Sequence, residues 1–133
     1  KSELSDLSRI NLTDSNDEII NKIKKAKTDP LPMPSNVEEL NNRPEAKNLI
    51  GIYSSLTNST LEKSIESFSG KNFSEFKLNL SQVLVDKLNP ISKEINRLLD
   101  DKNYLEKILN DGQRKADEIA SVKISKIHEI LGF

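Results

Sequence analysis

The sequence predicts an all-α fold, a helical bundle. Apolar residues recur at three- and four-residue steps over most of its 133 residues, and this is the spacing of one helix face. Residues that cap or end helices stand where the periodic stretches begin and stop. Val122-Lys123-Ile124 could form a strand in isolation, but its neighbours favour helix, and no alternating run of strand length stands elsewhere. No internal repeat is present.

The first helix is predicted over residues 16–27. Ser15 and Glu18 have the S-x-x-E spacing of a capping box, in which each residue satisfies a free N–H of the other. Ile19, Ile23 and Ala26 follow at helical spacing. Residues 1–14 have no sustained period and are predicted to form a loop and linker ahead of this helix.

Prolines decide the next part of the chain. Pro30, Pro32 and Pro34 lack an N–H and restrict the residues before them, so residues 28–42 are predicted as an extended connection without helix. Pro44 is suited to the first position of a second helix.

Three further helices are predicted towards the C-terminus. A short one over residues 61–68 ends before Gly70, a good terminator. The longest pattern runs from Phe73 to about Asp100, and Pro90 is predicted to kink or split it just after Leu88. The last helix is predicted over residues 102–133, with a weak point at Gly112.

The composition excludes several classes of function. Twenty Lys and Arg stand against 21 Asp and Glu, a net charge of −1 that excludes a polybasic protein. The absence of Cys excludes thiolate zinc sites and cysteine nucleophiles. A single His and scattered glycines give neither a metal site nor a phosphate loop, so no metal is predicted. No apolar run approaches membrane-spanning length, so no membrane partner is predicted.

Two groups of basic residues are candidates for contacting phosphates. The denser group, at the end of the first helix, comprises Lys22, Lys24, Lys25 and Lys27. These side chains spread around more than half of the helix, so they equally fit a solvated helix end. Arg114 and Lys115 form a second, weaker candidate.

Motifs along the whole chain resemble those of a known family. Lys1-Ser2 looks like the end of a KMSKS signature, and residues 22–29 (KIKKAKTD) resemble KIxxAxTD. Residues 48–53 (NLIGIY) resemble NLxxIY, and residues 88–91 (LNPI) resemble LxPI. Residues 108–120 are similar to ILxxGxxKAxxIA, followed by a closing LGF. In this order and spacing the chain resembles the C-terminal region of bacterial tryptophanyl-tRNA synthetases, a family of class I aminoacyl-tRNA synthetases.

The resemblance implies an enzyme, a ligase that activates tryptophan with ATP and Mg²⁺ and then charges the tRNA for tryptophan. Lys1 matches the second Lys of the signature, which implies a catalytic and ATP-binding role, and Ser2 matches its final Ser. The nucleotide-binding half and its HIGH motif are missing from this chain. The chain alone is therefore expected to be inactive and to bind neither ATP nor Mg²⁺.

The resemblance also implies an organisation and partners. Residues 1–14 are expected to be the end of the KMSKS loop and a linker, and residues 15–133 a helical domain that docks the anticodon arm. The parent enzyme is expected to be a cytoplasmic homodimer. The candidate RNA contacts are Lys22, Lys24, Lys25, Arg114 and Lys115.

Two alternatives stay open at this point. The sibling tyrosyl-tRNA synthetases usually continue into a further RNA-binding module, so the closing Leu131-Gly132-Phe133 favours the tryptophan enzyme. A non-enzymatic helical module that binds RNA or protein, with similarity of architecture only, is the second interpretation.

Overall fold

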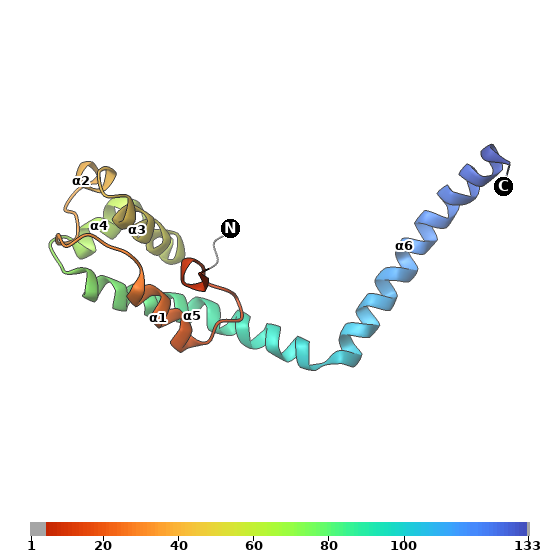
Figure 1. Cartoon of the computed structure of the whole chain (residues 1–133), viewed down its shortest axis with the longest axis horizontal. Coiled ribbons are helices and arrows are strands. Elements are labelled where there is room, and N and C mark those ends of the chain that lie inside the picture. Colours follow the sequence, from red (N-terminus) through yellow and green to blue (C-terminus); the bar gives the residue numbers. More distant parts are fainter. Residues whose placement is uncertain (1–4, 133) are drawn as a thin grey trace. The chain divides into compact units, whose positions relative to one another are not determined.

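A computed structural model describes residues 5–132, and all of its regular elements in that range are helices (Figure 1). They are η1 (Asp6–Ser8), α1 (Asn16–Lys25), α2 (Val37–Asn41), α3 (Pro44–Thr57), α4 (Leu61–Phe68), α5 (Phe73–Asp100) and α6 (Lys102–Leu131). The predicted all-α helical bundle is confirmed. The chain divides into two compact units, of which the first ends at Lys93 and the second begins at Glu94. Residues 5–14 belong to the first unit together with α1.

α1 begins at the predicted capping box. The Ser15 hydroxyl accepts from the Glu18 N–H at 3.3 Å, and the Glu18 carboxylate accepts from the Ser15 N–H at 2.8 Å. The helix ends at Lys25, two residues earlier than predicted, because the backbone turns extended at Ala26 (ψ 135°).

The prediction that residues 28–42 contain no helix is wrong for their second half. α2 begins after Asn36, whose side-chain oxygen accepts from the Glu39 N–H at 2.8 Å. Proline restricts its own residue and the one before it, and all three prolines precede Asn36. They therefore place no restriction on α2.

The proline-rich part of this connection, residues 28–35, is held at several points. The Arg43 guanidinium donates to both carboxylate oxygens of Asp29, at 2.9 and 2.6 Å. The Met33 N–H donates to the Lys71 carbonyl at 2.8 Å, and the Gly70 N–H donates to the Met33 carbonyl at 3.2 Å. Gly70 has φ +71°, a conformation that glycine adopts without strain.

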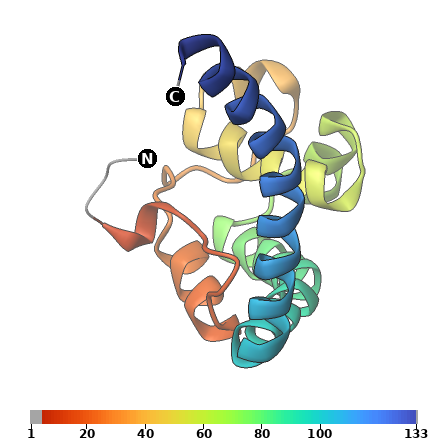
Figure 2. The ribbon, with the colours of Figure 1, turned by 90° about the vertical axis from the view of Figure 1, so that its right-hand side faces the viewer.

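The core of the first unit joins α1, α2, α3, α4 and α5, whose ribbons Figure 2 shows after a quarter turn of the view in Figure 1. At its centre Tyr53, Phe68 and Phe76 contact one another edge-on or tilted, with ring centroids 4.9–5.9 Å apart. Such offset geometry is the favoured one for aromatic pairs. The aromatic side chains of α3, α4 and α5 thus serve packing.

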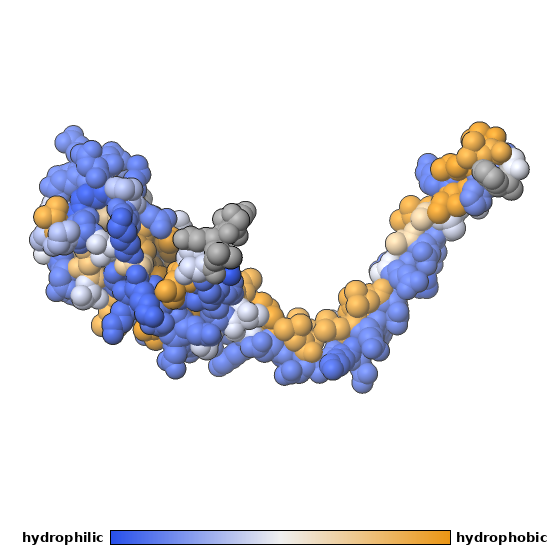
Figure 3. All heavy atoms as spheres, viewed as in Figure 1, coloured by the Kyte–Doolittle hydropathy of each residue, from blue (hydrophilic) through white to orange (hydrophobic). Residues whose placement is uncertain are grey.

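The two long helices are each continuous. α5 runs unbroken through Pro90, so the predicted split is wrong, and the kink stays a prediction. α6 runs through Gly112 and ends at Gly132, which has φ +78°. None of the α6 residues from Lys102 to Leu131 is buried, and its hydrophobic residues line one edge of the helix (Figure 3). Within residues 5–132, no helix combines the length and the apolar character that crossing a membrane requires.

Candidate functional site

The predicted ATP contacts Lys1 and Ser2 lie outside the described residues, which begin at Ser5. What the structure describes is the segment that follows them, residues 5–14, and its attachment to α1. η1 and the loop after it contact α1. The candidate site is therefore built from this attachment and from the basic end of α1.

A partly buried ionic cluster joins the N-terminal segment to α1. The Lys22 ammonium lies 2.7 Å from a carboxylate oxygen of Asp14 and 2.7 Å from one of Asp6. The side chains of Lys22 and Asp14 are only 6% and 7% exposed. Asn11 completes the cluster, since its side-chain amide donates to Asp6 at 3.3 Å and to Asp14 at 3.1 Å. We call these four residues the Lys22 anchor.

The pKa values within the Lys22 anchor favour its charged form. Burial acts to raise the pKa of Asp14, but the hydrogen bonds from Lys22 and Asn11 outweigh it and leave that pKa below its ordinary value. Hydrogen bonds from Lys22 and Asn11 also lower the pKa of Asp6. The hydrogen bonds to Asp14 and Asp6 raise the pKa of Lys22. The anchor is therefore ionised at neutral pH.

This geometry bears on the prediction that Lys22 contacts RNA, which stays a prediction. Lys22 lies three residues after the buried Ile19 and directly before the buried Ile23, so it shares the inner face of α1. Its ammonium is already occupied by Asp6 and Asp14, and a phosphate would have to displace them. The sequence pattern did not indicate these ion pairs of Lys22, because its acidic partners lie 8 and 16 residues away along the chain.

Lys24 and Lys25, in contrast to Lys22, are exposed to solvent. Within residues 5–132, neither ammonium has a hydrogen-bond or ion-pair partner. Lys27, the next lysine, pairs with Glu45 at 3.2 Å. Lys24 and Lys25 are thus the free cations at the end of α1, as a phosphate-contacting surface requires.

A groove of about 440 Å³ adjoins this end of α1, between α1 and the start of α5. We call it the α1–α5 groove, and it is lined by Ile20, Lys24, Thr28, Phe73, Ser74, Lys77, Leu78 and Ser81. Lys77 donates from its ammonium to the Ala26 carbonyl at 2.6 Å and so caps the end of α1. Burial lowers the pKa of Lys77.

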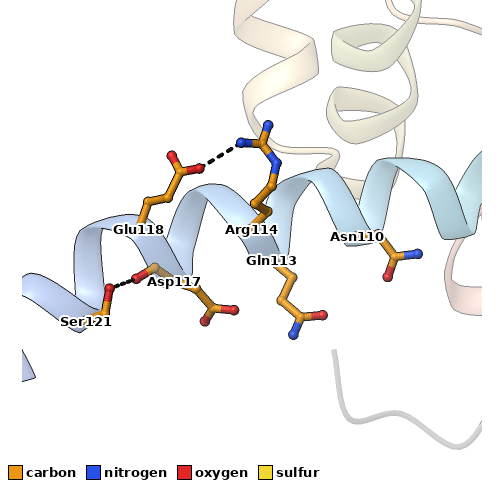
Figure 4. A pocket seen from close by; sticks show the side chains of 6 residues that line it. All are labelled: Asn110, Gln113, Arg114, Asp117, Glu118 and Ser121. Atoms are coloured by element: carbon orange, nitrogen blue, oxygen red, sulfur yellow. Dashed lines mark hydrogen bonds and ion pairs between the residues drawn. The ribbon is translucent and has the colours of Figure 1, made fainter.

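The second group of basic residues belongs to the second unit. Arg114 on α6 donates to Glu118 at 2.7 Å, with Asp117 close by on the same helix (Figure 4). A hollow of about 410 Å³ lies along these side chains. Lys115 is exposed. The acidic neighbours partly neutralise Arg114, so this surface is less positive than the end of α1.

Several contributing residues were not identified from the sequence. Asp6, Asn11 and Asp14 carry the anchor, and Lys77 caps α1 from 51 residues away. A local signal existed for Asn11 and Asp14, whose side chains are spaced as turn-forming residues are. The other contacts depend on tertiary packing and have no local pattern.

The described residues were also compared with the requirements of a metal site. Residues 5–132 contain no group of three or more His, Cys, Asp or Glu side chains that could hold a metal ion. Their charged groups include the ion pairs described above and the exposed Lys24 and Lys25. This arrangement suits contact with a polyanion and the attachment of a loop.

Comparison with known proteins gives a consistent set of relatives. No family model matches the chain. Over all 133 residues it is 47% identical to a tryptophan–tRNA ligase of Agrobacterium fabrum and 45% identical to one of Rhizobium meliloti, in each case covering 38% of the relative. It is 46% identical over the same length to a tryptophan–tRNA ligase of Rickettsia felis, covering 40% of it. The chain thus spans about two fifths of the length of the curated relatives it matches.

Proposed function

The chain corresponds over its whole length to the C-terminal portion of bacterial tryptophan–tRNA ligases, and from this we propose that it is the tRNA-binding part of such an enzyme. The observation that carries the proposal is the match of 42–47% identity along the entire chain. A non-enzymatic helical module with the same architecture is not favoured, because tryptophan–tRNA ligases match every residue of the chain.

The proposed parent enzyme uses ATP. Attack of the tryptophan carboxylate on the α-phosphorus forms tryptophanyl-adenylate and breaks the bond to the bridging oxygen, so pyrophosphate leaves with its negative charge. Lys1 is proposed to meet that charge with its ammonium, a point charge on a flexible stem. Ser2 is proposed to order the loop around the phosphates. Mg²⁺ would offset phosphate charge when bound with the ATP.

The end of α1 is the proposed contact for the anticodon arm. Lys24 and Lys25 are exposed and without partners within the described range, so they can approach phosphates without breaking an ion pair. Arg114 and Lys115 are a second proposed contact, weakened by Glu118. Because phosphate contacts position RNA without reading sequence, recognition of the anticodon bases must come from other polar groups.

The remaining partners follow from the same proposal. The enzyme is proposed to act in the cytoplasm as a homodimer, with the nucleotide-binding half on the same polypeptide. The chain by itself is proposed to be inactive.

The deciding experiment is ATP–pyrophosphate exchange by the full-length polypeptide, with tryptophan and tyrosine supplied in turn. Exchange that depends on tryptophan is the expected result. Exchange that depends on tyrosine would move the assignment to the sibling enzyme. A folded polypeptide that exchanges with neither would overturn the enzymatic proposal.

A further inference from the structure

The C-terminal end of α1 is by itself an unfavourable place for a phosphate, yet it carries the two free lysines. The aligned peptide dipoles of a helix leave partial negative charge at its C-terminus, where the last carbonyls have no partner within the helix. Anions bind at helix N-termini for the opposite reason. Lys24 and Lys25 are the last two residues of α1, so a phosphate that approaches them also approaches these carbonyls. Binding there requires a group that offsets the helix end.

α1 does not end in the way that commonly satisfies such carbonyls. Many helices close with a glycine or asparagine in the left-handed conformation, whose N–H donates back to the last turn. α1 is instead followed by Ala26, whose backbone is extended (ψ 135°). The Ala26 N–H donates to the Ile23 carbonyl at 3.1 Å. Two later carbonyls, those of Lys24 and Ala26, accept from a side chain on another helix.

That side chain is Lys77 of α5. Its ammonium donates to the Ala26 carbonyl at 2.6 Å and to the Lys24 carbonyl at 3.4 Å. A lysine in this position interacts favourably with the negative end of the helix dipole. The preceding residue, Phe76, is fully buried in the core, so the backbone that carries Lys77 is held by packing. The end of α1 is thereby fastened to α5.

The surroundings of Lys77 preserve its positive charge for the surface. Within the described part of the chain, no carboxylate pairs with its ammonium. Lys77 and Lys24 line the same α1–α5 groove, and none of the residues that line this groove is acidic. Two ammonium groups repel each other, and an acidic neighbour would relieve that repulsion only by cancelling positive charge. Because Lys77 donates to carbonyls, the groove keeps both charges and is complementary to an anion.

We infer that Lys77 is a positioning residue for RNA binding: by donating to the last carbonyls of α1 it holds Lys24 and Lys25 in place and offsets the negative helix end, so that phosphates can approach them. This inference rests on the proposed function, in which Lys24 and Lys25 contact the tRNA. Lys77 acts through these two residues and is not itself a phosphate contact, since it is half-buried and its ammonium is engaged by backbone carbonyls.

The test measures binding of a labelled tRNA for tryptophan to the full-length polypeptide, by fluorescence anisotropy over a range of salt concentrations. Lys77→Met, which keeps the aliphatic stem and removes the ammonium, is expected to lower the affinity about fivefold at low salt and to make its salt dependence shallower. Lys77→Arg is expected to bind nearly as well as the wild type, because guanidinium N–H groups can donate to the same carbonyls. Lys87→Met, an exposed lysine of the same helix, is the matched control and should change neither quantity.

Combined substitutions distinguish positioning from a direct phosphate contact. If Lys77 acts through Lys24 and Lys25, then Lys77→Met adds less than a twofold further loss of affinity in the Lys24→Gln, Lys25→Gln background. An equal loss in both backgrounds would overturn the inference, and so would no loss in either. A direct phosphate contact would give such an equal loss, with the salt slope shallower by about 0.7 to 0.9 in each background.

Hydrogen exchange provides a second readout at the helix end itself. The amides of the last turn of α1 are expected to exchange faster in Lys77→Met and at the wild-type rate in Lys87→Met, because only Lys77 fastens this turn. Unchanged exchange in Lys77→Met would overturn the inference. If Lys77→Met does not fold, Lys77→Gln keeps a polar group at the half-buried position, and the same losses are expected of it.

The outcome also distinguishes this inference from the proposed function. A wild-type polypeptide with tryptophan-dependent ATP–pyrophosphate exchange, whose tRNA affinity Lys77→Met does not alter, overturns the inference alone. A folded wild-type polypeptide without such exchange overturns the proposed function, and the inference with it.

Discussion

Removing the two free charges at the end of α1 should change how salt affects tRNA binding. The variant is Lys24→Gln with Lys25→Gln. Glutamine has nearly the same helix propensity as lysine, so α1 should persist. The core contacts of Ile19 and Ile23 lie on the other face of the helix and are untouched.

The magnitude follows from the number of charges that meet phosphate. Each phosphate contact contributes about 0.7 to 0.9 to the slope of log affinity against log salt concentration. Lys24 and Lys25 are both exposed and without partners within residues 5–132, so the slope should become shallower by about 1.4 to 1.8. Between 50 and 200 mM salt the affinity advantage of the wild type should shrink by about tenfold.

The assay is fluorescence anisotropy of a labelled tRNA for tryptophan with the full-length polypeptide, at four or more salt concentrations. The control is Lys63→Gln with Lys87→Gln, which removes the same charge from exposed positions on α4 and α5. ATP–pyrophosphate exchange should be unaffected by either double variant. An unchanged slope in the α1 variant, or an equal change in the control, would refute the reasoning and place the RNA surface elsewhere.

Four further variants test other parts of the structure. Lys1→Ala should lower tryptophan-dependent exchange by roughly a hundredfold or more while tRNA affinity stays nearly constant; equal exchange rates would remove its proposed role. Because the pKa of Asp14 is lowered in the fold, its contribution to stability is present above about pH 3.8 and is lost as the pH falls through the lowered pKa. Carbon-13 NMR titration should show this pKa rising in Lys22→Met, and an unchanged value would contradict the anchor. Gly51→Ala, inside α3 with nothing within 4 Å of the new Cβ, should stabilise by about 0.5–1 kcal/mol. Gly70→Ala, at φ +71°, should destabilise by about 1–2 kcal/mol; hydrogen exchange in α3 and α4 checks both signs.

Elements with local signals were predictable from the sequence. α4 has the predicted bounds, Leu61–Phe68, because Thr60 caps its start and Gly70 follows its end. α3 starts at Pro44 as predicted. α2 was not predicted, because the helix-breaking effect of the three prolines was extended to residues that they do not restrict. Asn36 is an ordinary N-cap residue for this helix.

The candidate site was less predictable, for a physical reason. Lys22, Lys24 and Lys25 look alike in sequence, and only packing separates the buried one from the exposed ones. The separation could have been argued from helix geometry, since Lys22 shares a face with Ile19 and Ile23. Which carboxylates would meet its ammonium depends on how residues 5–14 fold back, and no periodic pattern encodes that path.

The proline-rich connection, residues 28–35, determines whether a movement of the α1 end is transmitted to α3 and to the turn before α5. A segment without regular structure normally works as a slack tether, but this one is fastened by Arg43 to Asp29 and by Met33 to the turn around Gly70. Little free length remains between α1 and α3. A displacement of the α1 end by bound RNA would therefore be passed to α3 and to the turn before α5 instead of being absorbed in the connection.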